Sequence, residues 1–237
     1  MKKVIAIICA VLMLLSCAAC QGTNANKTDK YVVGICQLVQ HAAHDDATQG
    51  FMDALNETLP NQVTFINQVA SNDIAACSGI VNQFIAEEVD LILANATPAL
   101  QIASAATGDI PILGTSVTDY ATALNIANWT GTVGNNISGT SDLAPLDQQA
   151  AMIKELFPDA KTVGMIYCTS EPNSLYQINV IEGYLQELGY TCQRFAFNDV
   201  NDLGAVSEAA AMACDVLYVP TDNVVANYPE TVANMIK

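Results

Sequence analysis

Basic residues are scarce in this chain. Eight Lys and Arg stand against 24 Asp and Glu, which gives the 237 residues a formal net charge of −16. No Lys or Arg occurs between residues 31 and 153. A protein that binds nucleic acid or an anionic lipid surface neutralises phosphates with clustered Lys and Arg. The sequence therefore excludes nucleic acid and a polybasic membrane patch as modes of binding.

Sequence patterns of common enzyme sites are missing as well. The chain has no G-x-S-x-G, no glycine-rich phosphate loop and no H-E-x-x-H. Histidine occurs only at His41 and His44, so a Ser/His or Cys/His catalytic pair has weak support. We therefore predict neither an enzyme nor a cofactor, and we keep an extracytoplasmic enzyme only as the weaker alternative.

A long apolar run is also absent, and the longest one is at the amino terminus. Lys2 and Lys3 precede the run Val4–Leu15, whose twelve residues are too few to span a bilayer as a helix. Small residues follow the run, as they do at the cleavage site of a secretory signal. We predict a signal peptide over residues 1–20.

The segment around Cys20 resembles a bacterial lipoprotein cleavage site, in which the Cys after small residues takes the lipid. Cys20 fits best because Ala18 and Ala19 precede it. The usual Leu three positions before the lipidated Cys is here Cys17, which makes Cys17 a second candidate. Residues 21–30 are polar, as expected for a tether between a lipid and a domain.

The cysteines do not show an obvious disulfide or metal-binding pattern. Of the eight, five lie beyond the signal, and no C-x-x-C spacing occurs among these five: Cys36, Cys77, Cys168, Cys192 and Cys214. We interpret them as free cysteines that pack as small hydrophobes. A disulfide or a metal site among them stays open as an alternative.

From residue 31 onward, short apolar runs alternate with helical patterns in a chain that is 51% hydrophobic. Strands are predicted at 31–38, 63–68, 89–94, 111–115, 161–167, 190–196 and 215–219. Helices are predicted at 45–59, 73–87, from 97, at 145–157, from 173 to 188, at 202–213 and from 223 to the end, with Asp73, Thr97 and Asn173 as caps. Residues 116–144 are polar and form a crossover, in which 137–142 is a possible strand.

This alternation predicts an α/β protein with two doubly wound parallel-sheet lobes. We place the first lobe at residues 31–140 and the second, incomplete lobe at 141–237. Ligands of such sheets bind beyond the carboxyl ends of the strands. The rule selects the loops 38–45, 95–98, 116–120, 168–174 and 220–223.

These loops carry hydroxyls, amides and carboxylates, and several begin helices. A helix N-terminus binds a carboxylate through its free N–H groups without a basic side chain. Asp142, Glu171 and Asp222 are candidates to face an ammonium group, so the combination favours a zwitterionic ligand over a phosphate or a sugar. The alternative for Thr97, Asn173 and Asp222 is a purely structural role as N-caps.

A metal site is a second possibility at the first loop. His41 and His44 are three residues apart and can share a helix face, and Asp45 adjoins them. No third ligand is fixed by spacing, so we predict no metal and keep a metal-ion receptor as the alternative.

The sequence resembles the family of ABC-transporter substrate-binding lipoproteins related to tryptophan- and tyrosine-binding proteins. The resemblance runs over nearly the whole chain after the signal and rests on the stretches VVGICQLVQHAAHDDATQGFMDAL, VDLILANATPALQIASA, IPILGTSVTD, GTSDLAP, KELFPDAKTVGMIYCTSEPNSLYQ and DVLYVPTDNVV. The resemblance implies a type I periplasmic-binding-protein fold, in which an amino acid-like, often aromatic ligand binds between two lobes. It implies recognition roles for His41, Thr97, Ser116, Asp142, Glu171, Asn173, Ser174, Asp222 and Asn223. The implied partners are ABC permease subunits, at the outer side of a bacterial cell membrane to which a lipid anchors the protein.

Three departures from the family pattern matter. Tyr120 follows Asp119 where the family usually has Pro, and Pro229 interrupts the last helical pattern. The family also continues beyond the point that corresponds to Lys237. We therefore expect a fragment or a non-catalytic remnant of a truncated gene that binds its ligand poorly, with residues 224–237 frayed.

Overall fold

The structure is a computed structural model that describes residues 30–236. The predicted signal peptide, Cys17, Cys20 and nearly all of the tether lie outside the described residues. The part of the chain from Tyr31 onward forms one compact unit. Within residues 30–236, no helix is both long enough and apolar enough to cross a membrane.

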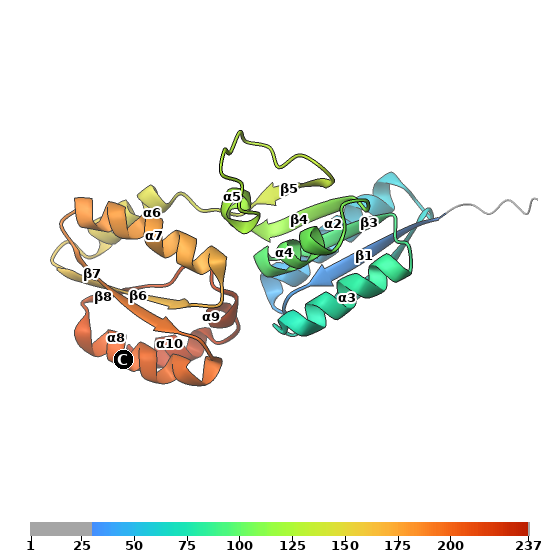
Figure 1. Cartoon of the computed structure of the whole chain (residues 1–237). Helices are drawn as coiled ribbons and strands as arrows, with labels where there is room; N and C mark the ends of the chain where they lie inside the picture. The colour runs from blue at the N-terminus through green and yellow to red at the C-terminus, as the bar shows by residue number, and fades with distance from the viewer. Residues whose placement is uncertain (1–29, 237) are drawn as a thin grey trace, which may run out of the picture. The chain divides into compact units, whose positions relative to one another are not determined.

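The first sheet has five parallel strands in the order β2-β1-β3-β4-β5 (Figure 1). The strands are β1 (Tyr31–Gln37), β2 (Val63–Val69), β3 (Leu91–Asn95), β4 (Ile112–Val117) and β5 (Ile137–Ser141). The first four were predicted from continuous apolar runs. The fifth confirms the possible strand in the polar crossover, so this segment completes the first lobe.

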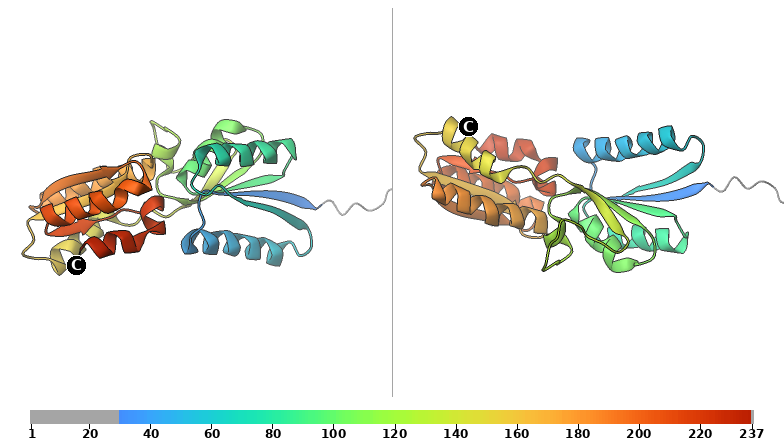
Figure 2. Two further views of the ribbon diagram at one scale, coloured as in Figure 1. Left: turned by 90° about the horizontal axis from the view of Figure 1, so that it is seen from below. Right: turned by 90° about the horizontal axis from the view of Figure 1, so that it is seen from above.

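Helices cover both faces of this sheet. They are α2 (Ala42–Thr58), α3 (Ile74–Ala86), α4 (Thr97–Ala106) and the short α5 (Tyr120–Ala123). Figure 2 shows α2 on the face opposite α3 and α4. Phe84 and Leu100 pack in the core beneath α3 and α4, whereas Ile35 and Leu93 pack against the side chains of α2.

Two close approaches in the first lobe require glycine. A Cβ at Gly34 would lie 2.6 Å from the Phe84 ring, so only glycine lets α3 pack this near to β1. The hydroxyl of Tyr120 lies 3.0 Å from the carbonyl of Gly114 and 3.1 Å from that of Thr140. A Cβ at Gly114 would lie 2.5 Å from the same hydroxyl, and a Cβ at Gly139 would collide with it. Tyr120 thus joins α5 to both β4 and β5.

The second sheet has three parallel strands in the order β7-β6-β8. They are β6 (Thr162–Cys168), β7 (Thr191–Phe197) and β8 (Val216–Tyr218). Helices α6 (Leu146–Leu156) and α7 (Pro172–Glu187) lie on one face in Figure 1, and α8 (Leu203–Ala213) and α10 (Pro229–Met235) lie on the other. The remaining elements are the 3-10 turn η2 (Val200–Asp202) and the short helix α9 (Asn223–Asn227). Two parallel α/β lobes, the second with three strands, confirm the predicted fold class.

Three details of the predicted helix ends are corrected or refined. Thr97 is the first residue of α4 and does not cap it, because Ala96 holds the cap position. Glu171 holds the cap position of α7, so Asn173 lies inside the helix. The predicted interruption at Pro229 is confirmed, because α9 ends at Asn227 and Pro229 opens α10.

The carboxyl-terminal helices are packed against the second lobe. Val224 and Val232 are buried in the same apolar cluster as Leu203 of α8. The expected fraying of residues 224–237 concerns motion, and it stays a prediction that hydrogen exchange can test.

Candidate functional site

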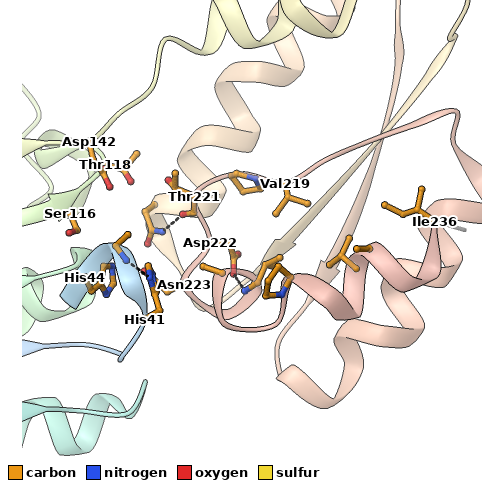
Figure 3. Close-up of a pocket in the computed structure, with 18 residues that line it drawn as sticks. His41, His44, Ser116, Thr118, Asp142, Val219, Thr221, Asp222, Asn223 and Ile236 are labelled. Atoms are coloured by element: carbon orange, nitrogen blue, oxygen red, sulfur yellow. Dashed lines mark hydrogen bonds between the residues drawn. The ribbon is translucent and has the colours of Figure 1, made fainter. Parts of the chain in front are cut away.

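Loops at the carboxyl ends of both sheets line one pocket of about 470 Å³ (Figure 3). Most of the predicted recognition residues lie on its wall, namely His41, Ser116, Asp142, Asn173, Asp222 and Asn223. Thr97, Glu171 and Ser174 are buried and are not among the residues that line the pocket. The pocket therefore lies where the strand-end rule placed the candidate site, and the roles of its residues stay predictions.

Two stacked imidazoles form part of the first-lobe wall. His41 caps α2, where its Nδ1 accepts a hydrogen bond from the Ala43 N–H at 3.1 Å. A neutral ring that accepts at Nδ1 carries its proton on Nε2 and can donate it to a ligand. The ring of His44 lies against that of His41, with centroids 4.2 Å apart and an angle of 26° between the planes. Burial lowers the pKa of His44 to about 4, so this ring is neutral near pH 7.

A hydrogen-bond network fixes the loop that carries these imidazoles. Gln37 at the end of β1 donates to Asp45 at 2.7 Å and accepts from Thr48 at 2.7 Å. Asn95 at the end of β3 donates to the His44 carbonyl at 2.9 Å and to the Thr48 hydroxyl at 3.0 Å. Asp45 thus supports the loop through this network. No cluster of three His, Cys, Asp or Glu suited to a metal occurs within residues 30–236.

The ends of β4 and β5 supply the hydroxyls and a carboxylate. Ser116 adopts a left-handed backbone with φ of 53°, at an irregularity in the pairing of β4 with β5. Asp142 follows β5, and its N–H donates to the Val117 carbonyl at 3.1 Å. Desolvation raises the pKa of the Asp142 carboxyl, and a hydrogen bond with the Thr118 side chain partly offsets this rise. Figure 3 shows Ser116, Thr118 and Asp142 together on one side of the pocket.

Asp222 is occupied by donors of the protein itself. Its side chain is 2% exposed and caps α9 by accepting from the N–H groups of Val224 at 3.1 Å and Val225 at 3.0 Å. Its other oxygen accepts from the Cys168 N–H at 2.7 Å and from the Ser174 hydroxyl at 2.8 Å. The carboxylate therefore connects the end of β6 and the first turn of α7 to α9. This is the structural role as an N-cap that was the alternative for Asp222.

Glu171 has a similar arrangement. It is 3% exposed and accepts from the Asn223 N–H at 2.9 Å, the Asn223 side chain at 2.7 Å and the Val224 N–H at 3.1 Å. Burial, and then the nearby charge of Asp222, raise the pKa of Glu171 to about 7. Two buried carboxylates thus hold the two second-lobe loops against each other. Their role as partners of a ligand ammonium stays a prediction.

One buried acceptor at the pocket has no partner in the protein. The amide nitrogen of Asn173 donates to Glu171 and to the Thr221 carbonyl, each at 3.0 Å, which fixes the amide orientation. Its Oδ1 is buried without any hydrogen bond, and Asn173 lines the pocket. A buried acceptor without a donor is costly, which makes this oxygen the unsatisfied polar atom nearest to hand among the residues of the pocket wall.

The sequence analysis overlooked two kinds of residue. Gln177 donates to the Thr221 hydroxyl at 2.6 Å and accepts from the Thr221 N–H at 3.2 Å, so it orients this loop. Its position in the stretch EPNSLYQ was the available signal. The apolar wall was also not predicted, because Val225, Val232 and Ile236 belong to α9 and the segment after it, which have no strand-end signature.

Comparisons with known proteins agree on one family. Residues 32–237 match the sequence profile of the family described as ABC transporter substrate binding protein. A tyrosine-binding protein of Clostridioides difficile (strain R20291) is 34% identical in an alignment 240 positions long, which covers 95% of this chain and 69% of that protein.

Solved structures show the same likeness. The crystal structure of an ABC domain in complex with L-Trp from Streptococcus pneumonia has a TM-score of 0.82 and 31% identity, covering 87% of this chain and 70% of that chain. The ligand-free, open structure of a substrate-binding protein with adhesive properties from Clostridium difficile has a TM-score of 0.61 and 35% identity, covering 86% and 70%. Both similarities extend over both lobes.

Proposed function

The chain belongs to the family of ABC transporter substrate-binding proteins, and on this premise we propose that it binds an aromatic amino acid in the pocket of Figure 3. The proposal rests on the buried, unpartnered Oδ1 of Asn173, a residue that lines the same pocket as Asp142. A relative named as a tyrosine-binding protein and a solved structure in complex with L-Trp support an aromatic side chain. The protein delivers this ligand to ABC permease subunits and performs no chemistry.

The proposed binding mode follows from charge. We assign the ammonium group to the Asp142 carboxylate and the Asn173 oxygen, because both are acceptors of residues that line the pocket. No Lys or Arg of residues 30–236 lines this pocket, so the carboxylate rests on neutral donors: the His41 Nε2–H, the Ser116 hydroxyl and N–H groups near Asn173. The Ser174 N–H already donates to the Glu171 carbonyl at 3.1 Å, which leaves this donor occupied. The apolar side chains of α9 and α10 enclose the aromatic ring.

Replacement of Asp142 by Asn is expected to weaken binding of L-tryptophan or L-tyrosine by about 10- to 150-fold. This range corresponds to the loss of a hydrogen bond to a charged group, about 1.5–3 kcal/mol. Titration calorimetry measures the change, and Asp119→Asn is the matched control because Asp119 follows β4 but does not line the pocket. Unchanged affinity would remove Asp142 from the site. Binding of sugars in place of amino acids would overturn the ligand class.

We further propose that residues 1–20 are a signal peptide, that residues 21–30 are a tether, and that a lipid on Cys20 holds the two lobes, 31–140 and 141–237, at the outer face of the membrane. The apolar run, the small residues before Cys20 and the polar segment after it support this arrangement.

The Cys20→Ser protein is expected to lose its membrane attachment and to incorporate no labelled fatty acid, because serine offers no thiol for thioether formation. Cell fractionation and metabolic labelling provide the two measurements. The control is Cys9→Ser, which changes a cysteine inside the apolar run. Continued labelling of Cys20→Ser, abolished instead by Cys17→Ser, would assign the lipid to Cys17.

A further inference from the structure

Two cysteines of the first lobe lie in direct contact. Cys36 is in β1 and Cys77 is in the first turns of α3, 41 residues further along the chain, yet their sulfur atoms are 3.2 Å apart. Both side chains are 0% exposed. They sit in the main apolar core of the lobe, where Ala70, Val81 and Ala94 are neighbours in the same cluster. Each thiol therefore has the other as its polar partner.

The other three described cysteines are arranged differently. The sulfur of Cys168 contacts the Ser170 hydroxyl at 3.0 Å. Cys192 lies in β7 and Cys214 two residues before β8, and β6 runs between these two strands. Strands on either side of a third are about 10 Å apart, which is too far for a disulfide. Among the cysteines of residues 30–236, Cys36 and Cys77 are thus the two whose sulfur atoms lie in contact.

We propose that Cys36 and Cys77 are a site of oxidative modification, at which the two thiols join as a disulfide that ties β1 to α3. The sulfur atoms need to approach by only about 1 Å to reach the covalent distance. Proteins outside the cytoplasm meet oxidants that form and preserve disulfides, and substrate-binding proteins of this family function there. This inference rests on the thiol contact and not on the identity of the ligand.

The reaction proceeds by two thiol–disulfide exchanges with an external disulfide, such as oxidised glutathione. The Cys77 thiolate attacks one sulfur of the oxidant, forms a mixed disulfide and releases the first thiolate, which takes up a proton. Cys36 then loses its proton and attacks the Cys77 sulfur, which releases the second thiol. Two protein thiols are oxidised and one external disulfide is reduced to two thiols, so atoms and electrons balance.

The structure distinguishes the two thiols in this sequence. Cys77 lies close to the start of α3, and the neighbouring Ile74 is exposed, so opening of the first turn brings Cys77 to solvent. The hydrogen bond with Cys36 lowers the pKa of Cys77, which favours its thiolate as the attacking group. The same hydrogen bond, together with burial, raises the pKa of Cys36 well above its usual range. Cys36 therefore acts second.

The disulfide would act on the ligand-binding side of the lobe. Cys36 directly precedes Gln37, whose side chain holds Asp45 and Thr48 in the loop network of the two imidazoles. The Gln37 carbonyl also accepts from the Ala70 N–H at 2.8 Å, three residues before Asp73, the cap of α3. A covalent link at this point fixes the end of β1 and the start of α3 together.

Peptide mapping of the full chain tests the site. Trypsin is unsuitable because no Lys or Arg lies between residues 31 and 153, so both cysteines would stay in one peptide. Cleavage before Asp residues separates them, since Asp45 and Asp73 lie between the two. After incubation with oxidised glutathione, a linked pair of peptides that contain Cys36 and Cys77 is expected, and reduction should separate it. Full alkylation of both thiols after unfolding, or a link to glutathione alone, would overturn the proposal.

Thermal unfolding tests the link independently. Reduction of the oxidised wild-type protein is expected to lower Tm by about 5–15 °C, since the disulfide would close a loop of 41 residues. In Cys77→Ala, reductant should leave Tm unchanged, whereas Cys214→Ala should keep the wild-type response. A wild-type Tm that does not respond to reductant would contradict the proposed tie, and this measurement does not depend on whether the variants fold.

Discussion

The Asp222→Ala protein is expected to lose about 3–5 kcal/mol of unfolding free energy, because several donors would lose a charged, buried acceptor at once. The carboxylate accepts from three backbone N–H groups and from the Ser174 hydroxyl. Alanine reaches none of these donors. Relief of the repulsion between Asp222 and Glu171 offsets part of the loss but does not replace the hydrogen bonds.

The matched control for this prediction is Asp73→Ala. Asp73 caps α3 by accepting from two backbone N–H groups, as Asp222 does at α9, but it is exposed and makes no further long-range hydrogen bond in the described structure. Its loss should cost about 1 kcal/mol, the usual value for an N-cap. Urea unfolding followed by circular dichroism measures both variants. Equal losses for the two would show that the contacts of Asp222 to β6 and α7 contribute nothing.

The Glu171 carboxyl is expected to make the protein less stable as the pH rises from about 4.5 to 7. Most paired carboxylates have the opposite effect, because their pKa is lowered in the folded protein. The pKa of Glu171 is raised to about 7 in the folded protein, by burial first and by Asp222 second, from an ordinary value of 4.5. Below pH 4.5 the Glu171 carboxyl is protonated in both the folded and the unfolded state, and its contribution to the free energy of unfolding is fully present. As the pH rises through 7, the folded protein must release a proton that the unfolded chain has already lost, so this contribution disappears. The difference between the pKa of Glu171 in the unfolded chain and in the folded protein corresponds to about 3 kcal/mol of unfolding free energy.

The Glu171→Gln protein isolates this effect, because glutamine does not titrate. The difference in unfolding free energy between wild type and Glu171→Gln should change by up to about 3 kcal/mol between pH 4.5 and 8. Glu182→Gln is the control for the removal of a carboxyl group elsewhere on α7, since Glu182 is less buried than Glu171 and pairs with Arg194. A constant difference for Glu171→Gln would show that Glu171 is ionised throughout this range.

The alternation of apolar runs and helical patterns was sufficient to predict the lobes. Strands such as β3 and β6, which helices cover on both faces, have continuous apolar sequences that only a parallel sheet explains. β5 was harder to identify, because its sequence ISGTS is small and mostly polar and it lies at the edge of the sheet. It remained only a possible strand, since its formation depends on pairing with β4 rather than on its own apolar content.

Loops that line the pocket were predicted from the sequence, but the contacts of individual residues were not. Asn173, from a loop selected at a strand end, and Asp142, from the predicted crossover, both line the pocket. Strand ends gave no indication that Glu171 and the Asn223 backbone, 52 residues apart, would hydrogen-bond to each other. A carboxylate that binds a ligand and one that holds two loops together have the same sequence signature. Only the positions of the donors distinguish the two roles.

The contact of Tyr120 with Gly114 and Gly139 has a consequence for how this protein can change through evolution. A methyl group at either glycine would displace the tyrosine hydroxyl, and loss of the tyrosine would leave a cavity beside two strands. Single substitutions at these three positions therefore pass through a poorly packed intermediate. Lineages should inherit Tyr120 and the two glycines together, or exchange all three for another combination, so an alignment of relatives should show these positions varying as a unit.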